Sequence, residues 1–382
     1  MAKISSPTPP DWSQLPEELL HLISKNLDNY CFDVVHARSV CHSWRSSIPF
    51  PSFLLRPSYS LPSIAEFPCK SKEMRTLEKI PLFLFRVLAP AAASPSEYFL
   101  GKIGRDESDE HMELLPSPLQ CSVKVKIPGS DPTLMNMLDC QILSLGHKYK
   151  MIGLDHQPLA IGYQGVAFLP LNEGGGEFVV LRNYNKVLLV LTSAEMKWKQ
   201  LQNIPDAICS DIATYRGRFY ATFHSGEIVV IDPYSLEVNL LLPSPQEPLH
   251  YLVPSSNDEL FLVEVIFPVL EVIVFSQFTC RVSRLDEKAG KWVEVIDLGD
   301  RVLFIGQLGN FSCSAKELPH GCGLSRNSIL FTHGLGNVTF PFKYGVHTGN
   351  AEDDLNCWRS SRKNRVVILN KSYPVITLRV ER

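Results

Sequence analysis

The sequence has no hydrophobic run long enough to cross a membrane. Its most apolar stretch, residues 260–275, is too short and is interrupted by Glu264, Pro268 and Glu271. The first twelve residues hold three prolines and one lysine around no apolar core, which argues against a signal peptide or a transit sequence. We therefore expect a protein of the nucleus, the cytoplasm or both, with no membrane partner.

The sequence also lacks a strong excess of either charge. Its 37 lysines and arginines nearly balance its 40 aspartates and glutamates, for a formal net charge of −3. Binding to nucleic acid or to anionic lipid normally needs a strongly basic surface, so we expect neither partner. A basic run at residues 359–365 is interpreted as a solvated loop, with a nuclear import signal or a nucleic-acid contact as the alternative.

The ten cysteines lack the closely paired hooks that are typical of structural zinc sites. The tightest group is Cys313, His320 and Cys322, with His333 beyond, and its spacing does not fit such a site. Without a route to the secretory pathway the cysteines are expected to be reduced thiols, mostly buried. We expect no metal and no cofactor.

Catalytic motifs are missing as well. The sequence has no phosphate-binding loop, no G-x-S-x-G elbow and no H-E-x-x-H helix. The glycine-rich residues 172–178 lead into a predicted strand rather than into a helix N-terminus, so we expect a hairpin turn there. His111, His147, His156 and His224 are scattered in no catalytic order. We therefore expect a protein that is not an enzyme.

What the sequence does have is a short helical module near its start. Pro16 suits the first position of a helix, where its missing N–H is not needed. Leu19, Ile23 and Leu27 then recur every four residues and form a stripe on one helix face. A second short helix is predicted over residues 33–38.

Ser39 is predicted to cap a third helix, in which Val40, Trp44 and Ile48 are again four residues apart and which ends at Pro49. Three helices in about 40 residues cannot bury all of these apolar stripes by themselves. Apolar surface left over on so small a module indicates a partner helix.

The module resembles the F-box motif over about residues 12–50. The resemblance is carried by Leu15-Pro16-Glu17-Glu18-Leu19-Leu20, Arg38-Ser39-Val40-Cys41 and Ser43-Trp44-Arg45. It implies docking on the Skp-type adaptor of a Skp–cullin–F-box ubiquitin ligase and, through the adaptor, association with cullin.

The same resemblance implies which residues meet the adaptor. Leu15 and Pro16 would lie at the contact, and Leu19, Ile23, Leu27, Val40 and Trp44 would lie in or beside the helical interface. The segment between Leu27 and Val40 is slightly longer than in compact F-boxes, which leaves the register of the second helix open. The alternative is a helical hairpin that merely packs on the rest of the chain.

After residue 50 the helical pattern nearly vanishes. Residues 51–100 are rich in proline and serine. From about residue 121 the chain consists of short apolar runs divided by Gly, Asn, Asp and Pro, which is typical of an all-β domain. Hairpins are predicted at residues 178–192, 217–232 and 328–343, each with turn residues between its two arms.

A weak repeat indicates the kind of all-β domain. Residues 196–201 and 290–295 share a tryptophan followed three positions later by an aliphatic residue, and Trp198 and Trp292 lie 94 residues apart. Two units of about 47 residues match the period of propeller blades. We predict six or seven blades, with Trp198 and Trp292 as structural blade residues. Two β-sandwiches are the alternative.

Residues 291–322 and 328–333 resemble the C-terminal domain of a large family of plant F-box proteins, a β-propeller of the kink-suppressor type, and residues 215–221 and 226–233 fit the same family. We therefore expect a small all-α F-box module of three helices followed by an all-β propeller. The expected boundaries are a disordered N-terminus at 1–10, the F-box at 11–50, a linker at 51–75 and the propeller at 76–382.

Together the two resemblances imply a substrate-recognition subunit of a Skp–cullin–F-box ubiquitin ligase, with a propeller that binds an unknown target protein for ubiquitination. The alternative is a non-degradative regulator that binds a protein partner through the propeller and blocks it. Loops around residues 173–177 and 320–326 are predicted to contact the target.

Overall fold

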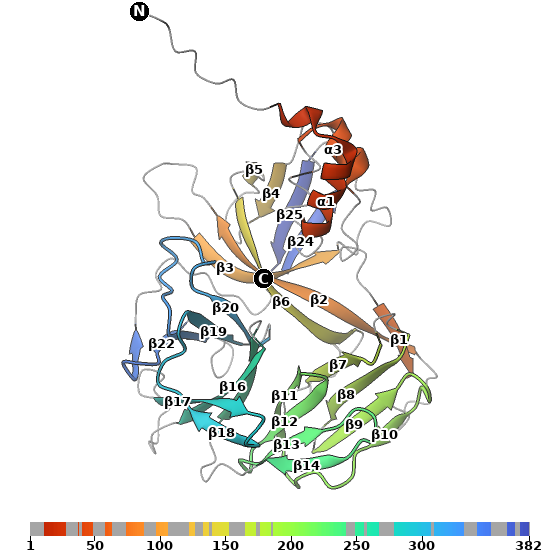
Figure 1. Cartoon of the computed structure of the whole chain (residues 1–382), viewed down its shortest axis with the longest axis vertical. Helices are drawn as coiled ribbons and strands as arrows, with labels where there is room; N and C mark the ends of the chain where they lie inside the picture. Colours follow the sequence, from red (N-terminus) through yellow and green to blue (C-terminus); the bar gives the residue numbers. More distant parts are fainter. Residues whose placement is uncertain are drawn as a thin grey trace, which may run out of the picture. The chain divides into compact units, whose positions relative to one another are not determined.

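The computed structural model describes residues 11–27, 37, 40–48, 58–62, 74–87, 97–105, 122–126, 133–136, 140–152, 165–172, 176–184, 186–241, 249–255, 258–266, 279–306, 309–331, 342–352, 365–370 and 375–381. The chain forms two compact units, each of which is described by itself (Figure 1). The first unit comprises residues 1–56, 103–142 and 365–382, and the second comprises residues 57–102 and 143–364.

The first unit contains the N-terminal helices. A 3-10 turn, η1 (Trp12–Gln14), precedes α1 (Glu17–Leu27), and α3 (His42–Ser47) follows. In α1 the first turn is acidic and the last turn carries Lys25, an arrangement that complements the helix dipole. Of the helix predicted at residues 33–38, only Ala37 lies within the described residues, and it is helical.

The third helix differs from its predicted start. It begins at His42, with Cys41 at the N-cap position and no side-chain hydrogen bond there, so the prediction that Ser39 caps it is wrong. Because Val40 precedes this helix, it does not share the buried stripe of Trp44 and Ile48.

The first unit also contains four strands. β24 (Arg365–Asn370) pairs antiparallel with β25 (Val375–Glu381), which pairs in parallel with β4 (Ser122–Lys126), and β4 pairs antiparallel with β5 (Thr133–Asn136). The C-terminal residues that were predicted to complete the propeller are therefore grouped with the helical unit.

The second unit is an all-β propeller whose described strands form five sheets (Figure 1). Within this unit the first sheet has β1 (Ser58–Pro62), β2 (Met74–Val87), the part of β3 (Glu97–Arg105) up to residue 102 and the part of β6 (Cys140–Ile152) from residue 143. The second has β7 (Val166–Pro170), β8 (Phe178–Tyr184), β9 (Val187–Thr192) and β10 (Trp198–Gln200). The third has β11 (Cys209–Tyr215), β12 (Arg218–Phe223), β13 (Ile228–Ile231) and β14 (Val238–Leu241).

The last two sheets follow in the same chain order. The fourth has β15 (Leu249–Ser255), β16 (Glu259–Ile266), β17 (Thr279–Asp286) and β18 (Lys291–Glu294). The fifth has β19 (Arg301–Ile305), β20 (Phe311–Ser314), β21 (Ser328–Phe331), β22 (Phe342–Gly345) and β23 (Asn350–Glu352). In the fifth sheet the strand order is β20-β19-β21-β22-β23, and β19 and β21 run parallel.

The first two predicted hairpins are confirmed, because β8 pairs with β9 up to Tyr184 and Val187 and β12 pairs with β13. β21 also pairs with β22, but β22 begins at Phe342, and the predicted turn lies outside the described residues. Between β12 and β13 the turn places Gly226 at φ 86°, a left-handed conformation that glycine adopts without a steric penalty.

Apolar layers between neighbouring sheets close the ring. Strand residues alternate between the two faces of a sheet, so Val179 and Leu181 pack against the third sheet while Val180 packs against the first. Further layers lie between the third and fourth, the fourth and fifth, and the fifth and first sheets. Five layers for five sheets leave no open end, and closure protects strands that would otherwise be exposed edges.

The prediction of six or seven blades is wrong, because the described strands form five sheets. The spacing between the two tryptophans does match two blades. Trp198 lies on the outermost strand of the second sheet, and Trp292 lies on the outermost strand of the fourth sheet. The count failed because residues 103–142 and 365–382 belong to the other unit and were treated as blade sequence.

The first strand also begins earlier than the predicted boundary of the propeller. β1 lies within residues 51–75, which were predicted to be a linker, and it pairs with β2 from Ser58 to Pro62. Leu61 is fully buried in the layer between the first and second sheets, which explains why this segment is a strand.

The two repeat tryptophans lie in these layers. Trp198 packs against the layer between the first and second sheets, and its indole N–H donates to the carbonyl oxygen of Pro62 at 2.8 Å. Trp292 packs in the same partly buried manner against the layer between the third and fourth sheets. Both side chains therefore contact the propeller's own core.

Candidate functional site

The helical module has a small core of its own. Leu20, Ala37, Trp44 and Ile48 are buried there, and Leu15, Ile23, Leu27 and Cys41 pack against them while partly buried. The Trp44 indole N–H donates to the carbonyl oxygen of Trp12 at 2.8 Å, so the buried ring has a satisfied polar group. This bond joins the segment before α1 to α3.

The module also exposes apolar side chains. Trp12 is 57% exposed, Leu19 45%, Leu22 56% and Val40 50%, and Pro16 is exposed as well. Pro16, Leu19 and Leu22 follow at three-residue intervals, which places them on adjacent turns of one helix face. We call these five residues the exposed apolar set. Apolar exposure of this extent on so small a module is typical of a surface that a partner covers.

The residues that the F-box resemblance implied are distributed over both parts of the module. Pro16, Leu19 and Val40 belong to the exposed apolar set. The remaining four lie in the helical core or against it: Leu15, Ile23, Leu27 and Trp44. Sequence reasoning missed Trp12 and Leu22, and the spacing of Leu22 three residues after Leu19 was the signal that could have found it.

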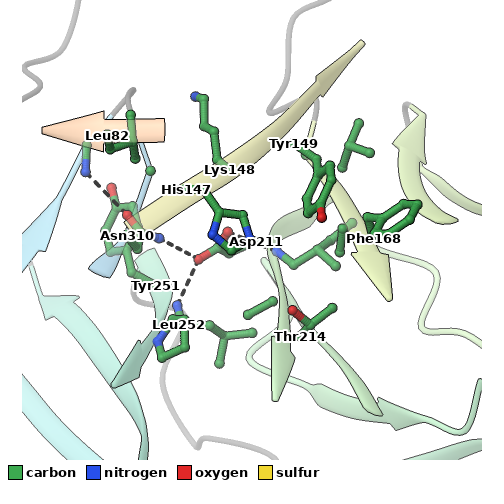
Figure 2. Close-up of a pocket in the computed structure, with 18 of the residues that line it drawn as sticks. Leu82, His147, Lys148, Tyr149, Phe168, Asp211, Thr214, Tyr251, Leu252 and Asn310 are labelled. Carbon is green, nitrogen blue, oxygen red and sulfur yellow. Dashed lines mark hydrogen bonds between the residues drawn. The ribbon is translucent and has the colours of Figure 1, made fainter. Parts of the chain in front are cut away.

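A second candidate site lies in the propeller. A cavity of about 510 Å³ is lined by residues of β2, β6, β7, β11 and β15 and by the turn between β19 and β20 (Figure 2). All of its lining residues belong to the second unit. Each of the five sheets contributes a strand or a turn to the lining, so the cavity lies where the five sheets converge.

Asp211 holds this convergence together. Its buried carboxylate accepts three hydrogen bonds: Oδ1 from the Ile212 amide at 2.9 Å, and Oδ2 from the Leu252 amide at 2.8 Å and from Asn310 Nδ2 at 2.7 Å (Figure 2). Leu252 lies on the fourth sheet and Asn310 at the start of the fifth sheet's β20, so one carboxylate links three sheets. Charge-assisted bonds of this kind are among the stronger ones in proteins.

The tyrosines and the histidine of the cavity walls keep their neutral forms near pH 7. Burial raises the pKa of Tyr149 to about 12, and burial together with the charge of Asp211 raises the pKa of Tyr251. Loss of surrounding water, reinforced by the charge of Lys79, lowers the pKa of His147 to about 4, even though part of that side chain reaches solvent. The phenols are then protonated and the imidazole is uncharged.

The histidines and cysteines singled out from the sequence do not form one cluster. His147 lines the cavity, whereas His224 is exposed on the turn between β12 and β13; His111 and His156 lie outside the described residues. Cys313 and Cys322 are buried between the first and fifth sheets, and burial raises the pKa of the Cys313 thiol to about 12. Within the described ranges, no three His, Cys, Asp or Glu side chains come together to hold a metal ion.

The loops predicted to contact the target are only partly described. Gly176 and Glu177 are exposed before β8, while residues 173–175 lie outside the described residues. In the other loop His320 is exposed, and its carbonyl oxygen accepts a hydrogen bond from the Tyr98 hydroxyl at 3.1 Å. Among the helices that the structure describes, none is long and apolar enough to cross a membrane.

Comparison with known proteins gives two family matches. The family described as KIB1-4 beta-propeller matches residues 59–357, and the F-box domain matches residues 12–56. Two Arabidopsis thaliana proteins described as F-box/kelch-repeat proteins are 63% and 60% identical to this chain, each over 98% of it and over 97% and 96% of their own lengths. The Arabidopsis F-box protein SKIP23 is 30% identical, over 86% of this chain and 84% of its own.

Similarity to solved structures is slight. An oligogalacturonate lyase in complex with manganese aligns with 49% of this chain and 53% of its own at 14% identity and a TM-score of 0.28, which supports no argument about function.

Proposed function

The chain belongs to the plant F-box proteins with a KIB1-4 β-propeller, and from this we propose that it is a substrate receptor of a Skp–cullin–F-box ubiquitin ligase. Its F-box binds a Skp-type adaptor, and its propeller binds a target protein. The receptor contributes proximity rather than chemistry, since holding the target near a charged ubiquitin makes the transfer effectively intramolecular.

The observation that carries the proposal is the exposed apolar set on the helical module. Leu19 and Leu22 are about half exposed on a module whose core is already occupied by Leu20, Trp44 and Ile48. A helix of the adaptor that covers this face would bury the exposed apolar area. Removing such area from water is favourable by about 25 cal/mol of free energy per Å². Leu15 and Pro16, at the entrance to α1, lie at the edge of the same contact.

The proposal is tested by co-purification of adaptor and cullin with the tagged full-length chain. Leu19→Glu combined with Leu22→Glu places two charges on the exposed face without touching a buried residue, so adaptor and cullin are expected to be lost while the protein remains folded. Tyr234→Glu is the matched control, because Tyr234 is 73% exposed on the propeller.

Two results would count against the proposal. If the double variant retained adaptor and cullin at the wild-type level, the module would not be the docking surface. If the wild-type chain purified with a bound protein but with neither adaptor nor cullin, it would be a regulator that blocks its partner without ubiquitin transfer.

A further inference from the structure

The cavity in the propeller has walls of strands that are hydrogen-bonded within their sheets. Its volume of about 510 Å³ lies within the range of roughly 300–1,000 Å³ that is typical of small-molecule pockets. The walls are strands of several sheets, and Asp211 joins three of those sheets through hydrogen bonds of 2.7 to 2.9 Å. Such a cavity is largely formed before any ligand arrives, which reduces the entropic cost of binding.

One wall offers a flat apolar surface. The ring of Tyr149 is stacked on Phe168, with centroids 4.6 Å apart and an interplanar angle of 27°. Phe168 is in turn stacked on Phe178 at 5.2 Å, so the wall is backed by a second ring. A stacked pair of this kind is fixed in orientation and presents π-surface to a planar ring of similar size.

Beside this wall are neutral hydrogen-bonding groups. Ser210 lines the cavity, and its hydroxyl oxygen is buried with no hydrogen-bond partner among the residues that the structure describes. The hydroxyl of Thr214 and the imidazole of His147 line the same space (Figure 2). Since a buried polar group without a partner costs free energy, a ligand hydroxyl or amide that bonds to Ser210 is favoured.

Charged groups in the cavity do not favour a charged ligand. The Asp211 carboxylate already accepts three N–H donors, so a cation would have to compete with the amides of Leu252 and Ile212 and with Asn310. An anion would meet the same carboxylate. The Lys148 side chain extends away from Asp211 (Figure 2). A charged ligand would therefore lose hydration that this cavity does not replace.

We propose that this cavity binds a small uncharged molecule that combines a planar ring with a hydroxyl or amide group. The ring lies against Tyr149, and the polar group bonds to Ser210 and its neighbours. The proposal does not depend on the receptor role, because every residue that it uses belongs to the propeller rather than to the helical module.

Three probes that share a phenyl ring and carry an uncharged, an anionic or a cationic polar group test this ligand class on the full-length chain. Benzyl alcohol, benzoate and benzylammonium are compared by ligand-observed NMR titration. Benzyl alcohol is expected to bind about tenfold more tightly than either ion, a difference of about 1.4 kcal/mol. Because His147 and the tyrosines keep their neutral forms, its affinity should stay constant between about pH 5.5 and pH 8.

Variants locate the probe. Ser210→Ala removes the unpartnered hydroxyl and is expected to lower the affinity for benzyl alcohol several-fold. The melting temperature of the protein should be unchanged or raised. Thr214→Trp fills the cavity and should abolish binding. Tyr234→Phe, an exposed tyrosine on the same propeller, should change nothing.

Equal binding of the three probes, or binding that follows the titration of a group near pH 6.5, would overturn the ligand class. If Ser210→Ala and a folded Thr214→Trp both bound benzyl alcohol as tightly as the wild type, the cavity would not be the binding site. If Thr214→Trp does not fold, the Ser210→Ala comparison decides alone, since that substitution removes a single atom.

Discussion

Some apolar residues of the helical module are buried in its core, and others are exposed on its surface. Trp44, which the F-box resemblance implied in or beside the adaptor interface, is 9% exposed and fixed by its bond to Trp12, so it shapes the module from within. Leu19 and Val40 are exposed by half their surface. In the propeller, Asp211 joins the third sheet to the fourth and to the fifth through hydrogen bonds with Leu252 and Asn310.

Asp211→Asn is expected to lower the free energy of unfolding of the propeller by at least ~2 kcal/mol. An amide replaces one acceptor oxygen with an NH₂ group, which then faces an N–H donor from Ile212, Leu252 or Asn310. Urea unfolding measures the change as a shift of the midpoint. Asp206→Asn, at an exposed aspartate, is the control, and equal midpoints for the two variants would show that the carboxylate does not hold the sheets together.

At the scale of the element, helix α1 has one buried face and one exposed face. Leu20 is fully buried in the helical core, while Leu22, two residues on, is 56% exposed. The sequence predicted the helix and its apolar character, but it followed the four-residue spacing of Leu19, Ile23 and Leu27. That spacing identifies an apolar stripe, but it does not show which of its residues are buried. Burial depends on where the second and third helices pack.

Leu20→Ala and Leu22→Ala should therefore separate an effect on folding from an effect on binding alone. Leu20→Ala removes core atoms and is expected to cost ~2–5 kcal/mol, enough to unfold the module. Leu22→Ala is expected to stay within ~0.5 kcal/mol of wild type and to weaken adaptor binding alone. Circular dichroism with thermal melting, followed by an adaptor titration, distinguishes them; a Leu22→Ala variant that loses helicity while Leu20→Ala keeps it would contradict the two-face description.

At the scale of the whole molecule, two families meet in one chain, and the sequence predicted both. The hairpins at residues 178–192 and 217–232 could be predicted because their turns and alternating apolar residues are local signals. The number of blades could not, since it depends on which distant segments pair, and residues 375–379 pair with residues 122–126. Asp211 was also missed, although an aspartate within an apolar strand is itself a signal of a buried polar contact.

The receptor role predicts a division of labour between the two domains. The F-box module is expected to determine association with the ligase, and the propeller to determine which protein is held. A variant that loses only the adaptor should therefore keep its target, and the target should then remain unmodified.

Ubiquitin transfer in a reconstituted Skp–cullin–F-box reaction tests this role most directly, with a target captured by the full-length chain as the substrate. The wild-type chain is expected to support ubiquitination of the target, whereas Leu19→Glu with Leu22→Glu is expected to retain the target and to support none. Transfer by the double variant at the wild-type rate, or no transfer by a wild-type chain that holds both adaptor and target, would contradict the account.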